Sequence, residues 1–149
     1  TKVAAQDMTV YAKWGYTVKF ENTDLEDQVL EYVHVLPTIA KEGHVFGGWF
    51  DNAEFAGEAI TKVTQNATIY AKWTVNKYEV TYVNADLVKE TLDYGTTLPT
   101  PTKVGYTFAG WFNNPELTGE AINKVGAANL TVYAKWDINS YTVKFENCD

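Results

Sequence analysis

The tetrapeptide Tyr-Ala-Lys-Trp occurs three times in this chain, ending at Trp14, Trp73 and Trp136. A second marker, Gly-Trp-Phe, occurs at residues 48–50 and 110–112. The two markers keep the same spacing of about sixty residues, and a period of this length indicates tandem copies of one supersecondary unit. The chain is therefore predicted to fold as a series of small repeats, each with its own core.

Residues 16–63 align without gaps with residues 78–125, and 24 of the 48 positions are identical. We assign residues 1–14 to the end of a preceding repeat, 16–73 to a first repeat, 78–136 to a second repeat and 141–149 to the start of a further one. Natural arrays are usually closed by atypical polar repeats, whereas both ends here match ordinary repeat sequence. We therefore expect a fragment of a longer array.

Composition excludes several classes of partner. The net charge is −7 and the chain has no arginine, which argues against nucleic acid, because phosphate binding needs clustered cations and favours arginine. No apolar run approaches the eighteen or so residues that a membrane helix needs. The single cysteine, Cys148, can form neither a framework disulfide nor a zinc site with paired ligands. The core must then stabilise each repeat by itself.

Period-two alternation predicts mainly strands. In residues 16–21, Tyr16, Val18 and Phe20 are predicted to face the core, while the intervening residues face solvent. Further strands are predicted at the remaining apolar segments of each repeat, namely 28–33, 43–50, 68–73 and 90–94. Asn114-Pro115-Glu116 combines an N-cap residue with proline at N1, so a short helical turn is predicted at 114–117. The prediction is weaker at 52–55.

Large aromatic side chains are the predicted core anchors, because each buries on the order of 150–250 Å². They are Phe46, Trp49, Trp73, Phe108, Trp111 and Trp136. Within residues 43–50, the glycines beside Trp49 predict a bulge or a close backbone approach. Exposed tryptophans can also stack on sugars, and that interpretation is kept as an alternative to the core role.

The second repeat carries a longer pattern, Pro-Thr-Pro-Thr-Lys-Val-Gly-Tyr-Thr-Phe-Ala-Gly-Trp-Phe at 99–112, closed by Tyr-Ala-Lys-Trp at 133–136. This pattern resembles the Listeria-Bacteroides repeat family, which includes the internalin B-repeat. The resemblance implies a β-grasp-like unit, so the expected class is α+β and β-rich, with a mostly four-stranded sheet and a short helical turn per repeat. The first repeat departs from the pattern at Val33, at residues 39–40 and at His44, which puts a shared ligand site there in doubt.

The search for reaction chemistry is negative. Both histidines, His34 and His44, lie in the first repeat, and the second has threonine and tyrosine at the equivalent positions, so neither is predicted to be a catalytic base. Asp51-Asn52-x-Glu54 and its equivalent at 113–116 offer oxygen ligands for calcium, but they lack the ligand count of a tight site, so a capped turn is the favoured interpretation. We predict no catalytic residue, no cofactor and no metal site.

The resemblance implies an extracellular, bacterial cell-surface or secreted protein. The leading hypothesis is a non-enzymatic spacer or stalk that presents a distal domain, with neighbouring repeats as partners. The alternative is an adhesion module that binds host protein or glycan through a sheet edge or through exposed side chains of the closing strand. The candidate contact residues are Tyr70, Lys72, Tyr133 and Lys135.

Overall fold

The computed structural model describes residues 9, 14–31 and 34–146, and this part of the chain contains strands, turns and loops but no helix. The chain forms two compact units. Unit 1 comprises residues 1–40 and 46–74, and unit 2 comprises residues 41–45 and 75–149. The short segment 41–45, which belongs to the first repeat by sequence, is thus part of unit 2.

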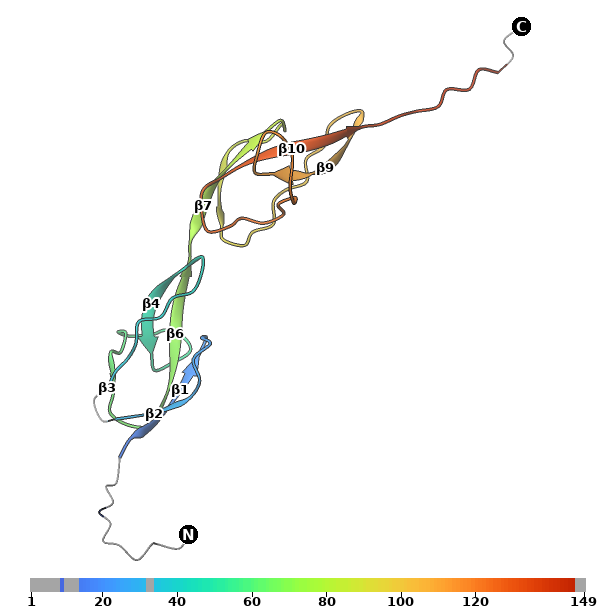
Figure 1. Ribbon diagram of the computed structural model, residues 1–149. Helices are drawn as coiled ribbons and strands as arrows, with labels where there is room; N and C mark the ends of the chain where they lie inside the picture. Colours follow the sequence, from blue (N-terminus) through green and yellow to red (C-terminus); the bar gives the residue numbers. More distant parts are fainter. Residues whose placement is uncertain (1–8, 10–13, 32–33, 147–149) are drawn as a thin grey trace, which may run out of the picture. The chain divides into compact units, whose positions relative to one another are not determined.

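The first repeat forms a four-stranded sheet in the order β2-β1-β6-β4 and a two-stranded sheet of β3 and β5 (Figure 1). Its strands are β1 (Tyr16–Glu21), β2 (Gln28–Leu30), β3 (His34–Val35), β4 (His44–Phe50), β5 (Lys62–Val63) and β6 (Ala67–Val75). The second repeat forms the equivalent sheet in the order β8-β7-β10-β9. Its strands are β7 (Lys77–Val83), β8 (Glu90–Asp93), β9 (Tyr106–Phe112) and β10 (Leu130–Ile138).

The first and last strands of each repeat lie side by side at the centre of the sheet and run parallel. In the first repeat, Val18 pairs with Ala67 and Phe20 with Ile69. In the second, the same parallel register joins β7 to β10, whereas β8 and β9 are antiparallel edge strands. Each sheet therefore closes only when the two ends of its repeat have met.

The alternation predicted for residues 16–21 is confirmed. Val18 and Phe20 are buried and Tyr16 is half-buried, while the three intervening side chains are exposed. Ile69 and Ala71 on β6 face the same core. Val80, Val132 and Ala134 occupy the corresponding positions of the second core.

Trp49 and Trp111 are buried at the centre of their cores, with only 2% of each residue exposed. Each indole Nε1 donates a 2.7 Å hydrogen bond to a proline carbonyl oxygen, of Pro37 and Pro99 respectively. The bond satisfies the one polar atom of the ring, so the indole is buried without leaving a donor unpaired. It also fixes the Leu-Pro segment over the sheet.

A line of aromatic rings extends from each buried tryptophan towards the surface. In the second repeat, the ring of Phe108 packs at 5.2 Å from Trp111 and 5.5 Å from Trp136. Phe46 lies in the same way between Trp49 and Trp73, at 5.4 and 5.3 Å. The predicted anchors therefore form one continuous aromatic cluster in each repeat.

The close approach predicted for the glycines beside Trp49 is confirmed at Gly48, which has a φ of 103° and where a Cβ would fall 2.8 Å from the Cβ of Ala59. The equivalent strand of the second repeat combines such an approach with a bulge. Lys135 pairs with Gly110 and Trp136 with Phe108, so the register shifts by a bulge at this point. Gly110 has a φ of 129°, and a Cβ there would fall 3.1 Å from the Cβ of Ala121. Only glycine combines this backbone conformation with so close a neighbour.

The predicted α+β class is wrong, because the described residues form an all-β structure without helical turns, although the expected four-stranded sheets are present. At residues 114–117 the chain makes a single turn, closed by a 3.2 Å hydrogen bond from Leu117 N to the carbonyl oxygen of Asn114. Leu117 then adopts a left-handed conformation with φ 55°, which ends the right-handed turn. The Asn114 side chain accepts a hydrogen bond from Thr118 N instead of starting a helix.

Residues 141–146 have the same sequence as β1 but are exposed and form no strand. The strand partners of β1 are β2 and β6, which follow it in the chain. An isolated extended segment has no neighbouring strand for its backbone groups and no core for its apolar face.

Replacing Trp111 by phenylalanine is expected to reduce the free energy of unfolding of unit 2 by about 2–4 kcal/mol, because the variant loses buried volume and leaves the Pro99 carbonyl oxygen without its donor. Urea denaturation followed by amide NMR signals of unit 2 measures the change. Trp14→Phe is the matched control, since Trp14 is 86% exposed, and it should stay within about 0.5 kcal/mol of the parent. Equal effects of the two substitutions would contradict the anchor role.

Tyr82 makes the stability of unit 2 sensitive to alkaline pH. Burial raises the pKa of its hydroxyl well above the usual range, and the 2.7 Å hydrogen bond to the Glu90 carboxylate adds to the shift. The neutral hydroxyl is the form that the fold favours, so its contribution is complete below the unfolded pKa of about 10 and is lost as pH rises towards the folded pKa.

We therefore expect Tyr82→Phe to remove part of the stability loss that unit 2 shows above about pH 10. Thermal denaturation between about pH 8 and pH 11.5 measures this loss across the unfolded pKa. The fold should tolerate this substitution, because the first repeat has phenylalanine, Phe20, at the equivalent buried position. Glu90→Gln should lower the pKa of Tyr82 in a spectrophotometric titration. An unchanged pH profile in Tyr82→Phe would show that other groups control alkaline unfolding.

Candidate functional site

The four candidate contact residues lie on the closing strands β6 and β10, and all four are half-buried. The Lys72 ammonium lies 5.1 Å from the centroid of the Phe50 ring and 5.9 Å from that of Phe55. Lys135 lies in the same way over Phe112, at 5.5 Å. These lysines cover apolar rings of their own repeat through cation–π contacts, which leaves less of each side chain for a partner.

Trp73 and Trp136 close the aromatic clusters at the surface. Each remains half-buried, and each Nε1 donates a 2.8 Å hydrogen bond to a backbone carbonyl oxygen, of Asn22 and Asn84 respectively. Both asparagines have left-handed backbones, with φ of 61° and 60°. The closing tryptophan therefore holds the turn that follows the first strand of its own repeat.

Asparagine side chains that our sequence analysis did not single out as functional organise several other connections. Asn66 Oδ1 accepts a 2.9 Å hydrogen bond from Thr17 N, and Asn129 Oδ1 accepts one of 3.0 Å from Glu79 N. These bonds join the loop before each closing strand to the first strand. Recurrence at equivalent positions is the signal that could have identified them, because both repeats carry the same asparagine.

The two candidate calcium loops are closed by their own asparagines. Asn52 Oδ1 accepts a 2.9 Å hydrogen bond from Ala56 N, while its Nδ2 donates to the carbonyl oxygen of Ala56 and to the Asp51 carboxylate. Asn114 makes the equivalent bonds to Thr118 and Asn113. Within residues 9, 14–31 and 34–146, no cluster of three or more His, Cys, Asp or Glu side chains could hold a metal ion. The geometry is that of a capped turn.

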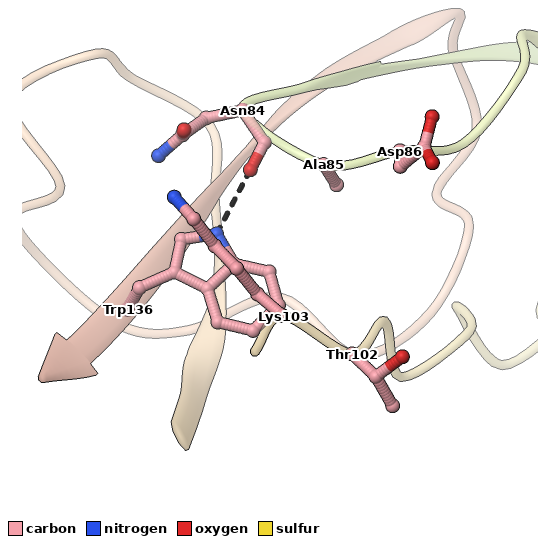
Figure 2. A pocket seen from close by; sticks show the side chains of 6 residues that line it. All are labelled: Asn84, Ala85, Asp86, Thr102, Lys103 and Trp136. Atoms are coloured by element: carbon pink, nitrogen blue, oxygen red, sulfur yellow. Dashed lines mark hydrogen bonds between the residues drawn. The ribbon is translucent and has the colours of Figure 1, made fainter. Parts of the chain in front are cut away.

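A shallow cavity of about 350 Å³ in unit 2 brings together an indole, an ammonium, a carboxylate and a hydroxyl. Figure 2 shows Lys103 extending across the indole of Trp136, with its Nζ 5.7 Å from the ring centroid. The cavity is lined by Asn84, Ala85, Asp86, Thr102, Lys103 and Trp136. Such a lining can donate and accept hydrogen bonds to a hydroxylated ligand, but Lys103 and Phe108 both pack on the indole.

Four of the six cavity residues recur in the first repeat, where the equivalent positions are Asn22, Asp24, Lys41 and Trp73. Sequence reasoning missed this grouping, because its members come from three separate segments that only the fold brings together. The remaining two positions differ, since Thr23 and Ala40 replace Ala85 and Thr102. The recurrence is one of sequence, and the cavity itself is described in the second repeat.

The histidines do not form part of this cavity. His34 is exposed on β3. The half-buried His44 ring lies 6.0 Å from the Tyr94 ring, and its Nδ1 is 2.8 Å from the Glu42 carbonyl oxygen. Cys148 lies outside the described residues. The described part of the chain has no helix that could cross a membrane.

The fold and these surfaces define a small all-β tandem repeat whose polar side chains mostly tie its own turns together. The sequence profile of the Listeria-Bacteroides repeat domain matches residues 16–72 and 78–135. These two matches cover most of the chain, with one in each repeat. The chain therefore belongs to the Listeria-Bacteroides repeat family, as the sequence motifs predicted.

Three relatives show the same kind of similarity. The chain is 33% identical to a putative membrane protein of Evansella cellulosilytica over 93% of its own length, and 32% identical to a putative Gly-rich membrane protein of that organism over 97%. It is 33% identical to internalin H of Listeria monocytogenes over 66% of its length. The aligned regions are only 24%, 19% and 20% of these longer relatives. The similarity therefore concerns only a minor part of each relative.

Replacing Lys135 by alanine is expected to lower the free energy of unfolding of unit 2 by about 0.5–1.5 kcal/mol, because it removes the cation and the side-chain stem that cover Phe112. Urea denaturation of the variant and the parent measures the effect. Lys144→Ala is the matched control, since Lys144 is exposed and outside any strand, and it should be close to neutral. A neutral Lys135→Ala would instead leave this lysine available as a contact residue.

Proposed function

We propose that this chain is a non-enzymatic repeat module of a bacterial cell-surface or secreted protein, and that it acts as a spacer that presents a distal domain. The observation that carries this proposal is the connection between β6 and β7, which consists of Asn76 alone. Its N–H donates a 2.8 Å hydrogen bond to the Gly43 carbonyl oxygen, and its own carbonyl oxygen accepts one of 2.8 Å from Tyr94 N. A flexible linker would leave these backbone groups to solvent.

The connection after the second repeat begins in the same way. Asn139 N donates a 2.9 Å hydrogen bond to the Gly105 carbonyl oxygen, as Asn76 N does to that of Gly43. Asn139 Nδ2 lies 3.4 Å from the Tyr141 hydroxyl, and Asn76 Nδ2 lies 3.3 Å from that of Tyr78. A connection that is hydrogen-bonded in a recurring pattern suits a stalk whose reach grows with each added repeat.

The surface location and the non-enzymatic character are part of the same proposal. The relatives include an internalin and two putative membrane proteins, and this chain matches only a minor part of each. Apart from the cavity residues Asp86 and Thr102, most of the polar groups described above bond to the chain's own backbone or cover its own rings. This supports a mechanical role better than a chemical one.

The cavity around Trp136 favours direct adhesion as a second candidate. Its combination of indole, lysine, aspartate and hydroxyl suits a glycan, and an array that carries several copies of the second repeat would allow weak sites to act together. A glycan array probed with the full chain tests this candidate. Binding that Asp86→Asn and Thr102→Ala both weaken would favour adhesion over a purely mechanical role.

The spacer proposal predicts that length grows by a constant increment when further copies of residues 78–140 are inserted into the full chain. Small-angle scattering of proteins with one, two and three inserted copies measures the maximum dimension. A freely jointed array would instead grow roughly with the square root of the number of repeats. The control series carries a Gly-Ser segment of about ten residues in place of each connecting asparagine and should follow the weaker dependence. A parent series that matches this control would refute the spacer.

A further inference from the structure

Unit 2 contains two copies of one turn, at residues 41–44 and 103–106. In each, the last residue donates a 3.1 Å backbone hydrogen bond to the carbonyl oxygen of the first. The third residue is glycine with a left-handed backbone, φ 69° at Gly43 and 79° at Gly105. Each glycine carbonyl oxygen accepts a hydrogen bond from an asparagine N–H, of Asn76 and Asn139 respectively. The two turns therefore have the same backbone and the same anchoring.

The two turns differ in what covers them. Gly43 is buried under the ring of Tyr94, and a Cβ at this glycine would fall 2.1 Å from Cγ of that ring. A Cβ at Gly105 would meet no other atom within 4 Å. The Tyr94 ring also packs against His44, at 6.0 Å between centroids. Partial desolvation and the neighbouring Glu42 carboxylate, which accepts a hydrogen bond from the hydroxyl, raise the pKa of Tyr94.

The uncovered turn presents an apolar surface. Val104 is 99% exposed and stands where the covered turn has Glu42. Tyr106, the last residue of the turn, and Ile138, which pairs with it on β10, are also exposed. An exposed valine and isoleucine beside an unfilled glycine can gain stability when an aromatic ring covers them.

The repeat itself supplies a ring of the right kind. Tyrosine occurs at the same position of both repeats, as Tyr32 and Tyr94 in the aligned sequence. Residues 141–147 repeat the opening of the first repeat, so the chain continues into repeat sequence directly after Asn139 and Ser140. A repeat that starts at Tyr141 would carry its equivalent tyrosine at nearly the same sequence distance from Asn139 as Tyr94 has from Asn76.

We propose that the turn at residues 103–106 is a docking surface for the next repeat of the array, whose tyrosine at the position equivalent to Tyr94 covers Gly105. This inference rests on the proposed array function and adds the contact by which one repeat recognises the next. Two separate requirements would then select glycine at position 105, namely the left-handed backbone and the close approach of the tyrosine ring. The valine at 104 makes this second contact more apolar than the first.

The experiment uses residues 1–140 of the chain followed by a second copy of residues 78–149, so that a third repeat enters through the natural connection. Glycine-selective NMR labelling reports ring currents at Gly43 and Gly105. In the parent chain, Tyr94→Ala measures the shift that a covering tyrosine causes at Gly43. In the three-repeat protein, Gly105 is expected to move in the same direction by at least half that amount.

Replacing the added tyrosine by alanine should return Gly105 to its position in the parent chain. Gly119 serves as the internal control, because it also has a left-handed backbone with no atom within 4 Å of where a Cβ would lie, and its signal should not move. An unchanged Gly105 signal overturns the proposal. A Gly105 shift in the parent chain that depends on concentration also overturns it, because the occupant would then be a second copy of the chain.

A substitution pair tests the same contact through stability. Gly43→Ala and Gly105→Ala share the backbone strain of a left-handed residue, but only Gly43→Ala collides with a ring. In the parent chain, Gly43→Ala should lower the melting temperature more than Gly105→Ala, and Tyr94→Ala should abolish the difference. In the three-repeat protein, Gly105→Ala should become as damaging as Gly43→Ala, and an unchanged effect would contradict docking.

The scattering series and the NMR experiment separate the two proposals. If the maximum dimension grows by constant increments but the Gly105 NMR signal does not shift, the spacer proposal is retained and the docking contact is rejected. If the Gly105 NMR signal shifts but the maximum dimension grows only with the square root of the number of repeats, the docking contact is retained and the spacer proposal is rejected. Each proposal can therefore fail without the other.

Discussion

The parallel pairing of the first and last strands is the constraint on which each repeat depends. β1 pairs with β6, and β7 with β10, so a repeat cannot complete its sheet until the chain has returned to its starting point, with Val18 paired to Ala67 and Val80 to Leu130. Strand formation here is a property of the whole repeat, which makes the repeat the cooperative unit.

The aromatic cluster stabilises this closure in a unit with a small core. Units of about sixty residues bury only about 60% of the surface of their unfolded chains, so a few large side chains must contribute much of the stabilisation. Trp111 joins the sheet to the Leu-Pro segment, and Trp136 joins the closing strand to the turn after the first strand. Phe108 packs between the two indoles. One line of rings thus connects the centre of the core to the surface.

The longer strands could be predicted because their signal is local, with apolar side chains on alternate positions of β1 and β6. The two-residue strands β3 and β5 were not predicted, because two residues carry no periodicity. The prediction of a helical turn at 114–117 was wrong, because Asn114 and Pro115 suit a capped loop as well as the first turn of a helix. The left-handed backbone of Leu117 decides between the two, and it has no sequence signature. The Asn129 bond to Glu79 N joins residues 50 positions apart, so its role could not be predicted from local pattern. The cavity residues were missed for the same reason, since three separate segments supply them.

Comparing the equivalent turns at 41–44 and 103–106 distinguishes residues that the backbone conformation requires from residues that a contact requires. Gly43 and Gly105 both have a left-handed backbone. This conformation by itself explains why glycine occurs at both positions, whether or not a partner covers them. The asparagine bonds to their carbonyl oxygens also recur and again belong to the turn itself. What differs is the cover, Tyr94 over Gly43 and open space over Gly105, together with the change from Glu42 to Val104. The two turns have the same backbone and the same asparagine bonds, but only Gly43 is covered by a tyrosine ring. A partner that covers Gly105 should therefore carry an equivalent tyrosine, and each repeat of this chain has one in its sequence.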